Sequence, residues 1–186
     1  MKRFFDIVMS MWALMVLFLP MVIVAFLVKM TSKGHVLYWS DRVGKNNVIF
    51  RMPKFRTMLV DTPAVATHLM ADPDRFLTRI GKLLRRTSID ELPQLWSILK
   101  GDMTIVGPRP ALFNQDDLIV LRTEKGVHIL TPGLTGPAQI NGRDELPIPV
   151  KVEFDEYYLK NRSFLFDLNI IVQTIFKAVK GDGVSH

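Results

Sequence analysis

An uncharged apolar stretch near the amino terminus is the feature that most constrains how this chain can fold. It covers residues 7–28 and reads IVMSMWALMVLFLPMVIVAFLV. The hydrocarbon core of a bilayer requires roughly 20 helical residues, so these 22 residues are enough to cross it. A cleaved signal peptide would have a shorter apolar region and a small-residue cleavage site, and neither condition is met. We therefore expect a membrane helix that is retained.

Pro20 lies inside this stretch and leaves the path of the helix open. Proline donates no backbone hydrogen bond and its ring crowds the carbonyl of Val16, so we expect a kink. The flanks do not set an orientation, because basic residues stand at both ends: Lys2, Arg3, Lys29, Lys33 and Arg42. The pattern alone is compatible with an ordinary span. It is equally compatible with a re-entrant helix that breaks at Pro20 and returns to the same face of the membrane.

Charge is distributed unevenly along the 186 residues, and the formal net charge is +6. Residues 41–110 hold 12 basic and 7 acidic residues, whereas residues 111–186 hold 8 basic and 10 acidic residues. The positively charged segment, residues 41–110, would attract anionic lipid headgroups or a substrate that carries phosphate. We expect no nucleic acid partner, because the chain lacks a basic stripe interleaved with aromatic residues. The absence of cysteine excludes a disulfide scaffold, a thiolate zinc site and a cysteine nucleophile.

The rest of the pattern predicts a mainly α fold with short β segments, of the α+β class. We expect a membrane helix in residues 1–33 and one compact catalytic domain with interfacial amphipathic helices in residues 34–186. Extended segments are expected at residues 48–58 and 102–110. The predicted helices cover residues 63–70, 76–86, 91–100, 111–125, 154–160 and 164–180. Residues 131–143 (TPGLTGPAQINGR) are predicted to be a loop, because they are rich in glycine and proline.

Two adjacent carboxylates, Asp90 and Glu91, lie in the sequence TSIDELP at residues 87–93. Pro93 is tolerated in the first turn of a helix, so a helix should begin close to Asp90. Alternatively, Ser88 could form a capping box with Glu91. In both cases the carboxylates lie at a helix N-terminus, which favours their ionised form. They are either ordinary helix-start acids or a functional pair, in which one attacks phosphorus and the other holds magnesium.

Several basic residues could surround this acidic pair. Lys54 and Arg56 share one face of a predicted strand, and Arg85 directly precedes the TSIDELP sequence together with Arg86. Arg109 lies in the sequence GPRP, where two prolines restrict its backbone. Each of these side chains alone would be interpreted as a solvated surface charge. Together with the carboxylate pair they indicate a site that handles phosphate.

Asp167 lies in the first turn of the last predicted helix. At 100° per residue it is roughly 120° from the centre of the polar stripe of that helix, which contains Asn169, Gln173, Lys177 and Lys180. This position suggests an inward role as a ligand or an orienting group. The alternative is a first-turn acid that follows an N-cap at Ser163.

An ordered series of motifs resembles the small monotopic phosphoglycosyl transferases, a family of bacterial sugar transferases. The longest is LLRRTSIDELPQLWSILKGDM at residues 83–103. The others are KRFFDI (2–7), TSKG (31–34), RVG (42–44), KFRTM (54–58), VGPRP (106–110), PGLTGPAQINGR (132–143) and GDGVS (181–185). The resemblance covers nearly the whole chain.

This resemblance implies transfer of a phosphosugar from a UDP-sugar to a polyprenyl phosphate, with release of UMP. It implies that Asp90 is the nucleophile of a covalent aspartyl-phosphosugar intermediate and that Glu91 is a Mg²⁺ ligand. The expected substrate-binding residues are Lys54, Arg56, Arg85, Arg109, Arg143 and Asp167.

The family's membrane element is a re-entrant helix broken at a Ser-Pro pair, where this chain has Leu19 before Pro20. The implied location is the bacterial inner membrane, with the catalytic domain on the cytoplasmic face. The expected partners are the UDP-sugar, the polyprenyl phosphate and membrane lipid, and a homo-oligomer is an open alternative. The expected pathway is the assembly of a bacterial surface polysaccharide, such as O-antigen or capsule, or of a glycoprotein glycan.

Two other functions compete with this interpretation. A membrane-tethered scaffold protein could use TSIDELP only as a helix start, and it would catalyse no reaction. A glycosyltransferase acting at the membrane would release UDP instead of UMP. The released nucleotide therefore separates all three.

Overall fold

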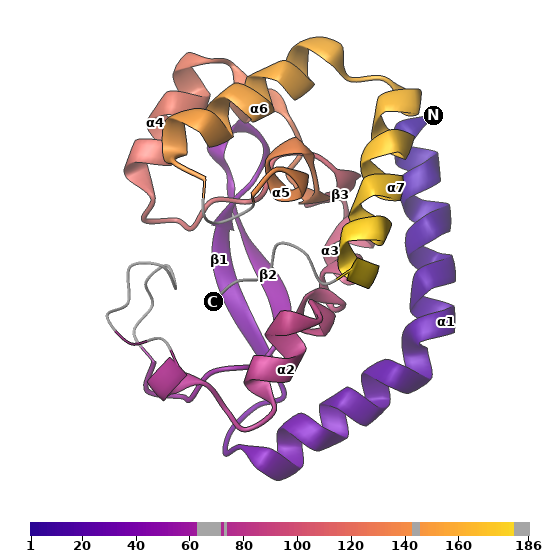
Figure 1. The fold of residues 1–186 in the computed structure, drawn as a ribbon, viewed down its shortest axis with the longest axis vertical. Coiled ribbons are helices and arrows are strands. Elements are labelled where there is room, and N and C mark those ends of the chain that lie inside the picture. Colours follow the sequence, from indigo (N-terminus) through magenta and orange to yellow (C-terminus); the bar gives the residue numbers. More distant parts are fainter. Residues whose placement is uncertain (63–71, 73, 143–145, 181–186) are drawn as a thin grey trace.

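The computed structural model describes residues 1–62, 72, 74–142 and 146–180 (Figure 1). The helix expected at residues 63–70 and the predicted substrate contact Arg143 lie outside the described residues. Helices dominate the described part of the chain, and the strands are short, as the sequence predicts.

The apolar stretch forms a single long helix, α1 (Lys2–Thr31), which is long and apolar enough to cross a membrane. Figure 1 shows α1 changing direction part way along its length. Pro20 lies inside the helix, and its missing hydrogen bond provides the physical cause of such a bend. The residues of α1 that are buried lie near its two ends: Asp6, Ser10, Val24 and Val28. Both limbs of α1 therefore contact the rest of the protein.

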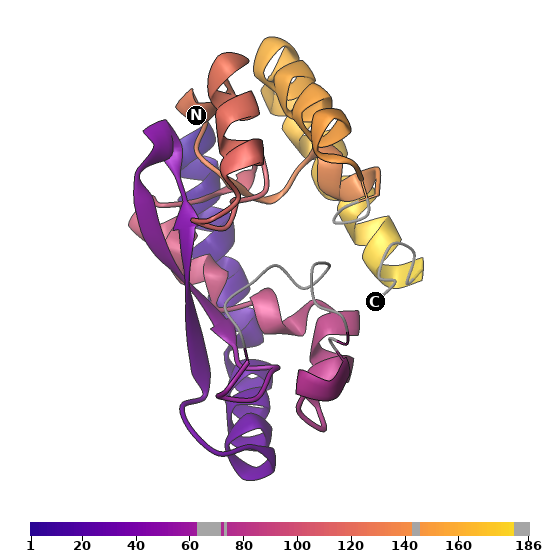
Figure 2. The same cartoon turned by 90° about the vertical axis from the view of Figure 1, so that its left-hand side faces the viewer.

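Two antiparallel strands follow α1, namely β1 (Leu37–Val43) and β2 (Ile49–Phe55). The short 3-10 turn η1 (Lys45–Asn47) joins them, and it uses left-handed backbone at Asn46 and Asn47. The predicted extended segment 48–58 corresponds to β2. Figure 2 shows this hairpin on the opposite side of the molecule from the two C-terminal helices.

A second pair of strands is parallel and joins distant parts of the sequence. It consists of β3 (Thr104–Val106) and β4 (Gly133–Thr135). The prediction of a loop at residues 131–143 is wrong here, because this segment contains β4 and the short helix α5 (Pro137–Ile140). Its glycines allow close approach between backbones: a Cβ on Gly133 would lie 2.1 Å from the backbone nitrogen of Gly107.

The remaining helices agree in part with the sequence prediction. They are α2 (Gly81–Arg86), α3 (Gln94–Lys100), α4 (Asp116–Glu124), α6 (Ile148–Asn161) and α7 (Phe164–Lys180). The predicted bounds of α7 are correct, and α3 ends before Gly101, which has a φ of 102°. By contrast, α2 begins later than residue 76 and α6 begins earlier than residue 154. Further 3-10 turns lie at η3 (Asp74–Phe76), η4 (Ile89–Glu91) and η5 (Val127–Ile129).

The hydrophobic core is divided into clusters, and α1 takes part in two of them. Val24 and Val28 pack with Phe55 of β2 and Leu84 of α2. The first limb of α1 contributes Ala13 and Leu14 to a cluster that contains Phe50, Met52, Leu95, Ile98 and Met103. A third cluster joins β3 to the C-terminal helices through Val106, Val127, Leu130, Ile140, Tyr158 and Ile170. The membrane-length helix is thus packed onto the body that carries the candidate site.

Candidate active site

The two carboxylates of TSIDELP lie in the 3-10 turn η4, between α2 and α3. Both are buried, with 6% of Asp90 and 7% of Glu91 exposed. The following helix begins at Gln94, with Pro93 as its N-cap residue, so the acids lie just before a helix start rather than inside it. This position is close to the predicted one.

Ser88, at the entrance to η4, has a left-handed backbone with a φ of 54°. An N-cap residue normally has extended backbone, so the predicted alternative of a capping box with Glu91 is not the one observed. The Glu91 amide instead donates to the Ser88 carbonyl at 3.1 Å. A non-glycine residue in this conformation is strained, and such strain is concentrated at functional sites. The sharp turn directs two consecutive acids into the protein interior.

Glu91 accepts hydrogen bonds from two cations that come from different elements. The Lys54 Nζ of β2 and the Arg109 Nη2 both lie 3.1 Å from the same atom, Glu91 Oε1. Burial lowers the pKa of Lys54, and the negative charges of Glu91 and Asp90 partly counteract this effect. The structure therefore brings together four of the predicted residues: Asp90, Glu91, Lys54 and Arg109.

Arg109 is held by a loop with a rigid backbone directly after β3. The Gly107 amide donates to the Thr135 carbonyl at 2.8 Å, and prolines stand on both sides of Arg109. The Arg109 carbonyl accepts a hydrogen bond from Arg122 Nη1 at 2.8 Å. Arg122 is in turn paired with Asp155 at 2.6 Å. Arg122 and Asp155 were not predicted as site residues, because no local sequence pattern reports a pair that joins α4 to α6.

Arg42 is a third residue near the site that was not predicted from the sequence. Its Nη1 donates to the Pro110 carbonyl at 3.2 Å, and its positive charge contributes to the lowered pKa of Lys54. The RVG motif at residues 42–44 marked this segment but did not indicate its contact with the Arg109 loop.

The other predicted substrate contacts occupy different places. Arg56 is buried and donates to the carbonyl and hydroxyl oxygens of Ser32 at 3.1 and 2.8 Å, so it ties the end of α1 to the end of β2. Arg85 is partly buried in the last turn of α2, directly before η4. These positions leave the substrate role of both residues a prediction.

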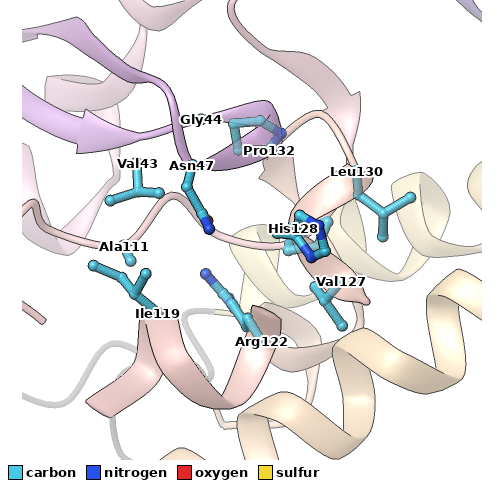
Figure 3. A pocket seen from close by; sticks show the side chains of 11 residues that line it. Val43, Gly44, Asn47, Ala111, Ile119, Arg122, Val127, His128, Leu130 and Pro132 are labelled. Carbon is cyan, nitrogen blue, oxygen red and sulfur yellow. The ribbon is translucent and has the colours of Figure 1, made fainter. Parts of the chain in front are cut away.

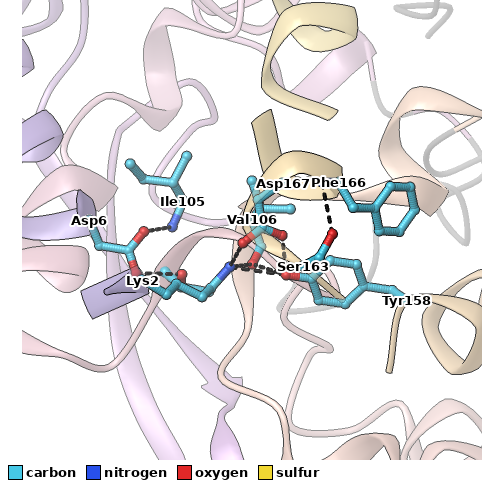
Figure 4. Close-up of polar contacts among 9 residues, drawn as sticks. Lys2, Asp6, Ile105, Val106, Tyr158, Ser163, Phe166 and Asp167 are labelled. Atoms are coloured by element: carbon cyan, nitrogen blue, oxygen red, sulfur yellow. Dashed lines mark hydrogen bonds and ion pairs between the residues drawn. The ribbon is translucent and has the colours of Figure 1, made fainter. Parts of the chain in front are cut away.

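Asp167 is buried beside the first turn of α1 (Figure 4). Its carboxylate lies 2.5 Å from Lys2 Nζ and 2.6 Å from the Tyr158 hydroxyl. Burial and this hydrogen bond raise the pKa of Tyr158. The hydroxyl of Ser163 accepts a hydrogen bond from the Phe166 amide at 3.2 Å. Ser163 therefore caps this helix start and Asp167 points inward, while the role of Asp167 as a ligand or an orienting group stays a prediction.

A small pocket lies beside the Arg109 loop and opens between the hairpin and α4 (Figure 3). Figure 3 shows the ends of Asn47 and Arg122 directed toward one another across it, with His128 close by. Val43, Gly44, Pro108, Ala111, Ile119, Val127, Leu130 and Pro132 complete its lining. This pocket adjoins the site through Pro108, the residue that precedes Arg109.

The carboxylate pair is the candidate place for a divalent cation. The described residues contain no group of three or more His, Cys, Asp or Glu side chains that could hold a metal ion. Magnesium, however, is often bound by one or two carboxylates together with substrate phosphates and water. The oxygen donors of Asp90 and Glu91 therefore fit a magnesium ion that is completed by a phosphate substrate.

The arrangement is typical of a transferase associated with a membrane. Buried carboxylates beside fixed cations suit the transfer of a charged group, and an apolar helix packed on the same body suits contact with lipid.

Comparisons with known proteins agree with this class. The family model for the bacterial sugar transferases matches residues 1–181. An uncharacterized sugar transferase of Bacillus subtilis (strain 168), EpsL, is 38% identical over 187 residues, which cover 100% of this chain and 90% of that protein. The exopolysaccharide production protein ExoY of Sinorhizobium fredii is 37% identical over 94% of this chain and 83% of its own length.

A third relative is the UDP-N-acetylgalactosamine-undecaprenyl-phosphate N-acetylgalactosaminephosphotransferase of Aeromonas hydrophila. It is 36% identical over 98% of this chain, which spans 44% of that longer protein. On these matches, the chain belongs to the bacterial sugar transferase family.

Proposed function

We propose that this protein transfers a sugar 1-phosphate from a UDP-sugar to a polyprenyl phosphate and releases UMP. The observation that carries the proposal is the buried pair of Asp90 and Glu91, with Lys54 and Arg109 converging on Glu91. The name of the Aeromonas relative, which includes both UDP-N-acetylgalactosamine and undecaprenyl phosphate, supports this choice of substrates. The name of the relative ExoY supports a role in exopolysaccharide production.

In the proposed first step, a carboxylate oxygen of Asp90 attacks the phosphorus atom that bears the sugar. The bond from that phosphorus to the UMP oxygen breaks, and UMP leaves with the bonding electrons. In the second step, a phosphate oxygen of the polyprenyl phosphate attacks the same phosphorus and releases the Asp90 carboxylate. An ionised carboxylate is itself a nucleophile, so its attack on phosphorus requires no separate base.

The surrounding side chains would stabilise charge and orient the phosphates. The guanidinium of Arg109 can bind two phosphate oxygens at once, and Lys54 supplies a compact positive charge. A magnesium ion held by Glu91 would supply further positive charge to the phosphate oxygens. Because these groups are already fixed by burial and hydrogen bonds, they need little reorganisation during the reaction.

The exposed face of α1 supports an attachment to the membrane on one side only. Large apolar residues are exposed along both limbs, among them Phe4, Trp12, Met15, Phe18, Leu19, Ile23 and Phe26. A straight span would carry one end of α1 to the far side of the bilayer, about 30 Å away. Contacts of both limbs with one body instead favour a helix that enters and leaves the same leaflet. We therefore propose a re-entrant helix at the cytoplasmic face of the inner membrane.

Helix α7 offers a second apolar surface for the membrane interface. Its exposed apolar residues share one face: Phe164, Leu165, Leu168, Val172, Ile175 and Phe176. The ring of Phe164 packs edge-on against Phe5 of α1, with ring centroids 5.4 Å apart. This face therefore begins beside the first turn of α1, and an interfacial position of α7 would place both helices against the same lipid surface.

The reaction is tested with purified protein, polyprenyl phosphate, magnesium and a panel of UDP-sugars. We expect UMP as the released nucleotide and, with the acceptor omitted, a phosphosugar adduct on Asp90 by intact-mass analysis. Release of UDP would identify a glycosyltransferase. No release with any sugar would favour the scaffold protein.

The membrane arrangement is tested by cysteine labelling, since the chain has no cysteine of its own. Phe4→Cys and Met30→Cys place one reactive thiol at either end of α1, and Glu153→Cys places a reference thiol on exposed α6. A membrane-impermeant reagent should label all three from the cytoplasmic side. Labelling of the two α1 positions from opposite sides would exclude re-entry.

A further inference from the structure

The first turn of α1 is polar and is bound to strand β3, which leads into the Arg109 loop. Asp6 is buried, and its carboxylate accepts hydrogen bonds from the Thr104 hydroxyl at 2.7 Å and the Ile105 amide at 3.1 Å. One helical turn earlier, Lys2 Nζ donates to the Val106 carbonyl at 2.9 Å (Figure 4). Two side chains of one helix turn thus bind all three residues of β3.

Among the side chains that the structure describes, none replaces Lys2 as the donor to the Val106 carbonyl. The Tyr158 hydroxyl also lies 3.1 Å from this carbonyl, but it lies 2.6 Å from Asp167 Oδ1. A hydroxyl has one hydrogen to donate, and the shorter contact with the carboxylate takes it. The Val106 carbonyl then depends on Lys2, which Asp167 holds in place at 2.5 Å.

The backbone between Val106 and Arg109 is stiff enough to transmit a displacement. The Gly107 amide is bound to the Thr135 carbonyl, and the Pro108 carbonyl accepts from the Gly133 amide, both at 2.8 Å. A Cβ on Gly107 would lie 2.6 Å from the Thr131 carbonyl oxygen, so the two backbones are in direct contact. Proline on each side of Arg109 restricts rotation further.

We propose that Lys2 is a positioning residue for the Arg109 guanidinium, so that the first turn of the membrane helix is part of the support of the catalytic site. Lys2 touches no reacting atom. It holds the end of β3, directly before the loop that carries Arg109 to Glu91. Arg109 Nη2 lies 3.1 Å from Glu91 Oε1. The consequence for catalysis rests on the proposed function, whereas the consequence for the loop backbone does not.

The kinetic test uses Lys2→Met, which removes the donor but keeps the length of the side chain. Lys2→Arg serves as the conservative variant. Arg3→Met is the matched control, because it removes one positive charge from the same helical turn. Arg3 binds the Ile98 and Leu99 carbonyls, which belong to the end of α3 and not to β3. We expect Lys2→Met to lower kcat/KM for the UDP-sugar by about ten- to a hundredfold, since small misplacements of a binding group have effects of this size. Lys2→Arg should recover most of this loss, and Arg3→Met should stay within about twofold of the wild type.

A double-variant cycle separates positioning from general destabilisation. If Lys2 acts through Arg109, the loss caused by Lys2→Met should largely disappear in an Arg109→Lys background. A loss of equal size in both backgrounds would overturn the proposal. Thermal unfolding of every variant, measured in the same detergent, identifies those that fail to fold.

Amide hydrogen exchange of the full, membrane-inserted chain provides a readout that needs no substrate. Lys2→Met should accelerate exchange in residues 104–111, above all at the Gly107 amide, and Arg3→Met should not. If the wild type released no UMP but this difference appeared, the proposed function would fail and the positioning role would stand. Equal exchange in the two variants would refute the positioning role even in an active enzyme.

Discussion

Two groups of charged side chains contact Arg109, one at its guanidinium and the other at its carbonyl. They differ in how many charges they contain and in how many elements supply them. At the site, Glu91 Oε1 receives two cations from separate elements, each at 3.1 Å, and Asp90 lies next to it in the sequence. On the other side, Asp155 is fully buried, and a single guanidinium binds its Oδ2 twice, at 2.9 and 2.6 Å. The Arg122–Asp155 pair joins one cation to one anion from two helices. The site instead gathers two carboxylates and two cations from several elements, and both cations can also bind the oxygens of a phosphate substrate.

Burial acts on both groups through the same physical effect. It raises the pKa of Asp155 and lowers the pKa of Lys54, because both charged forms lose hydration. At Asp155 the paired Arg122 opposes this shift, and at Lys54 the nearby carboxylates do so. Burial of a charge therefore does not by itself distinguish the site from the structural pair. The distinction lies in what else each charge can bind, and the following variants test it.

The largest expected effect on activity is that of Asp90→Asn. Loss of the attacking carboxylate should lower UMP release by about three orders of magnitude or more, with little change in thermal unfolding. Asp116→Asn, an exposed acid in the first turn of α4, is the matched control and should retain wild-type activity. Normal turnover in Asp90→Asn would remove this residue as the nucleophile.

The largest expected effect on stability belongs to the buried Arg122–Asp155 pair. Asp155→Ala leaves the Arg122 charge buried and without its carboxylate, so the free energy of unfolding should fall by about 3–5 kcal/mol. The measurement is denaturant unfolding in a fixed detergent. The double variant Asp155→Ala with Arg122→Met should be more stable than Asp155→Ala alone, because it removes the unpaired charge. If Asp155→Ala unfolded like the wild type, the distinction between a structural pair and a catalytic group would be lost.

A smaller effect is expected from Glu91→Gln, which keeps the shape of the side chain but removes its charge. The magnesium concentration for half-maximal UMP release should rise by at least about tenfold, since metal affinity depends on ligand charge. Chelation by EDTA should stop the wild-type reaction, and added magnesium should restore it. An unchanged magnesium titration in Glu91→Gln would count against its role as a ligand.

The smallest effect concerns the pH dependence set by Lys54. Burial holds the pKa of Lys54 in the folded protein below 10.5, the ordinary value for lysine. As the pH is raised, kcat/KM should therefore begin to decline before pH 10.5 is reached, because this cation deprotonates. Lys54→Arg should move this alkaline decline to higher pH, because arginine stays charged. A pH profile with the same alkaline limb in both proteins would exclude Lys54 as its origin.

The lowered pKa of Lys54 also predicts how the free energy of unfolding changes with pH. A lysine whose pKa is lower when folded binds fewer protons in the folded state than in the unfolded state. The unfolding free energy contributed by Lys54 therefore rises as the pH increases from its folded pKa toward 10.5. Relative to Lys54→Arg, the wild type should gain stability in this interval, as measured by denaturant unfolding at a series of pH values.

Elements with a strong local signal were predictable. The apolar run of α1, the amphipathic repeat of α7 and the glycine that ends α3 are each visible within a few turns of sequence. The carboxylate pair was also identified, because a proline at a helix start and two acids form a local pattern. By contrast, α6 begins at Ile148, before the predicted start at residue 154, and its first turn contains a proline, which that position tolerates.

The pairing of β3 with β4 was not predictable from local sequence. It joins Thr104 to Gly133 and Val106 to Thr135, and the glycines that make this approach feasible are the same residues that indicated a loop. Glycine permits both a turn and a close contact, so its interpretation depends on what lies opposite.

The sequence by itself determined the local features of this protein: a membrane-length apolar helix with a proline, adjacent acids before a helix, and an arginine between prolines. The tertiary structure decided which charges meet. It paired Lys54 and Arg109 with Glu91, directed Arg56 to Ser32, and joined Asp167 to Lys2. The physical reason is that helix starts and apolar runs depend on residues a few positions apart. A buried charge instead depends on partners supplied by distant elements, and only their packing selects those partners.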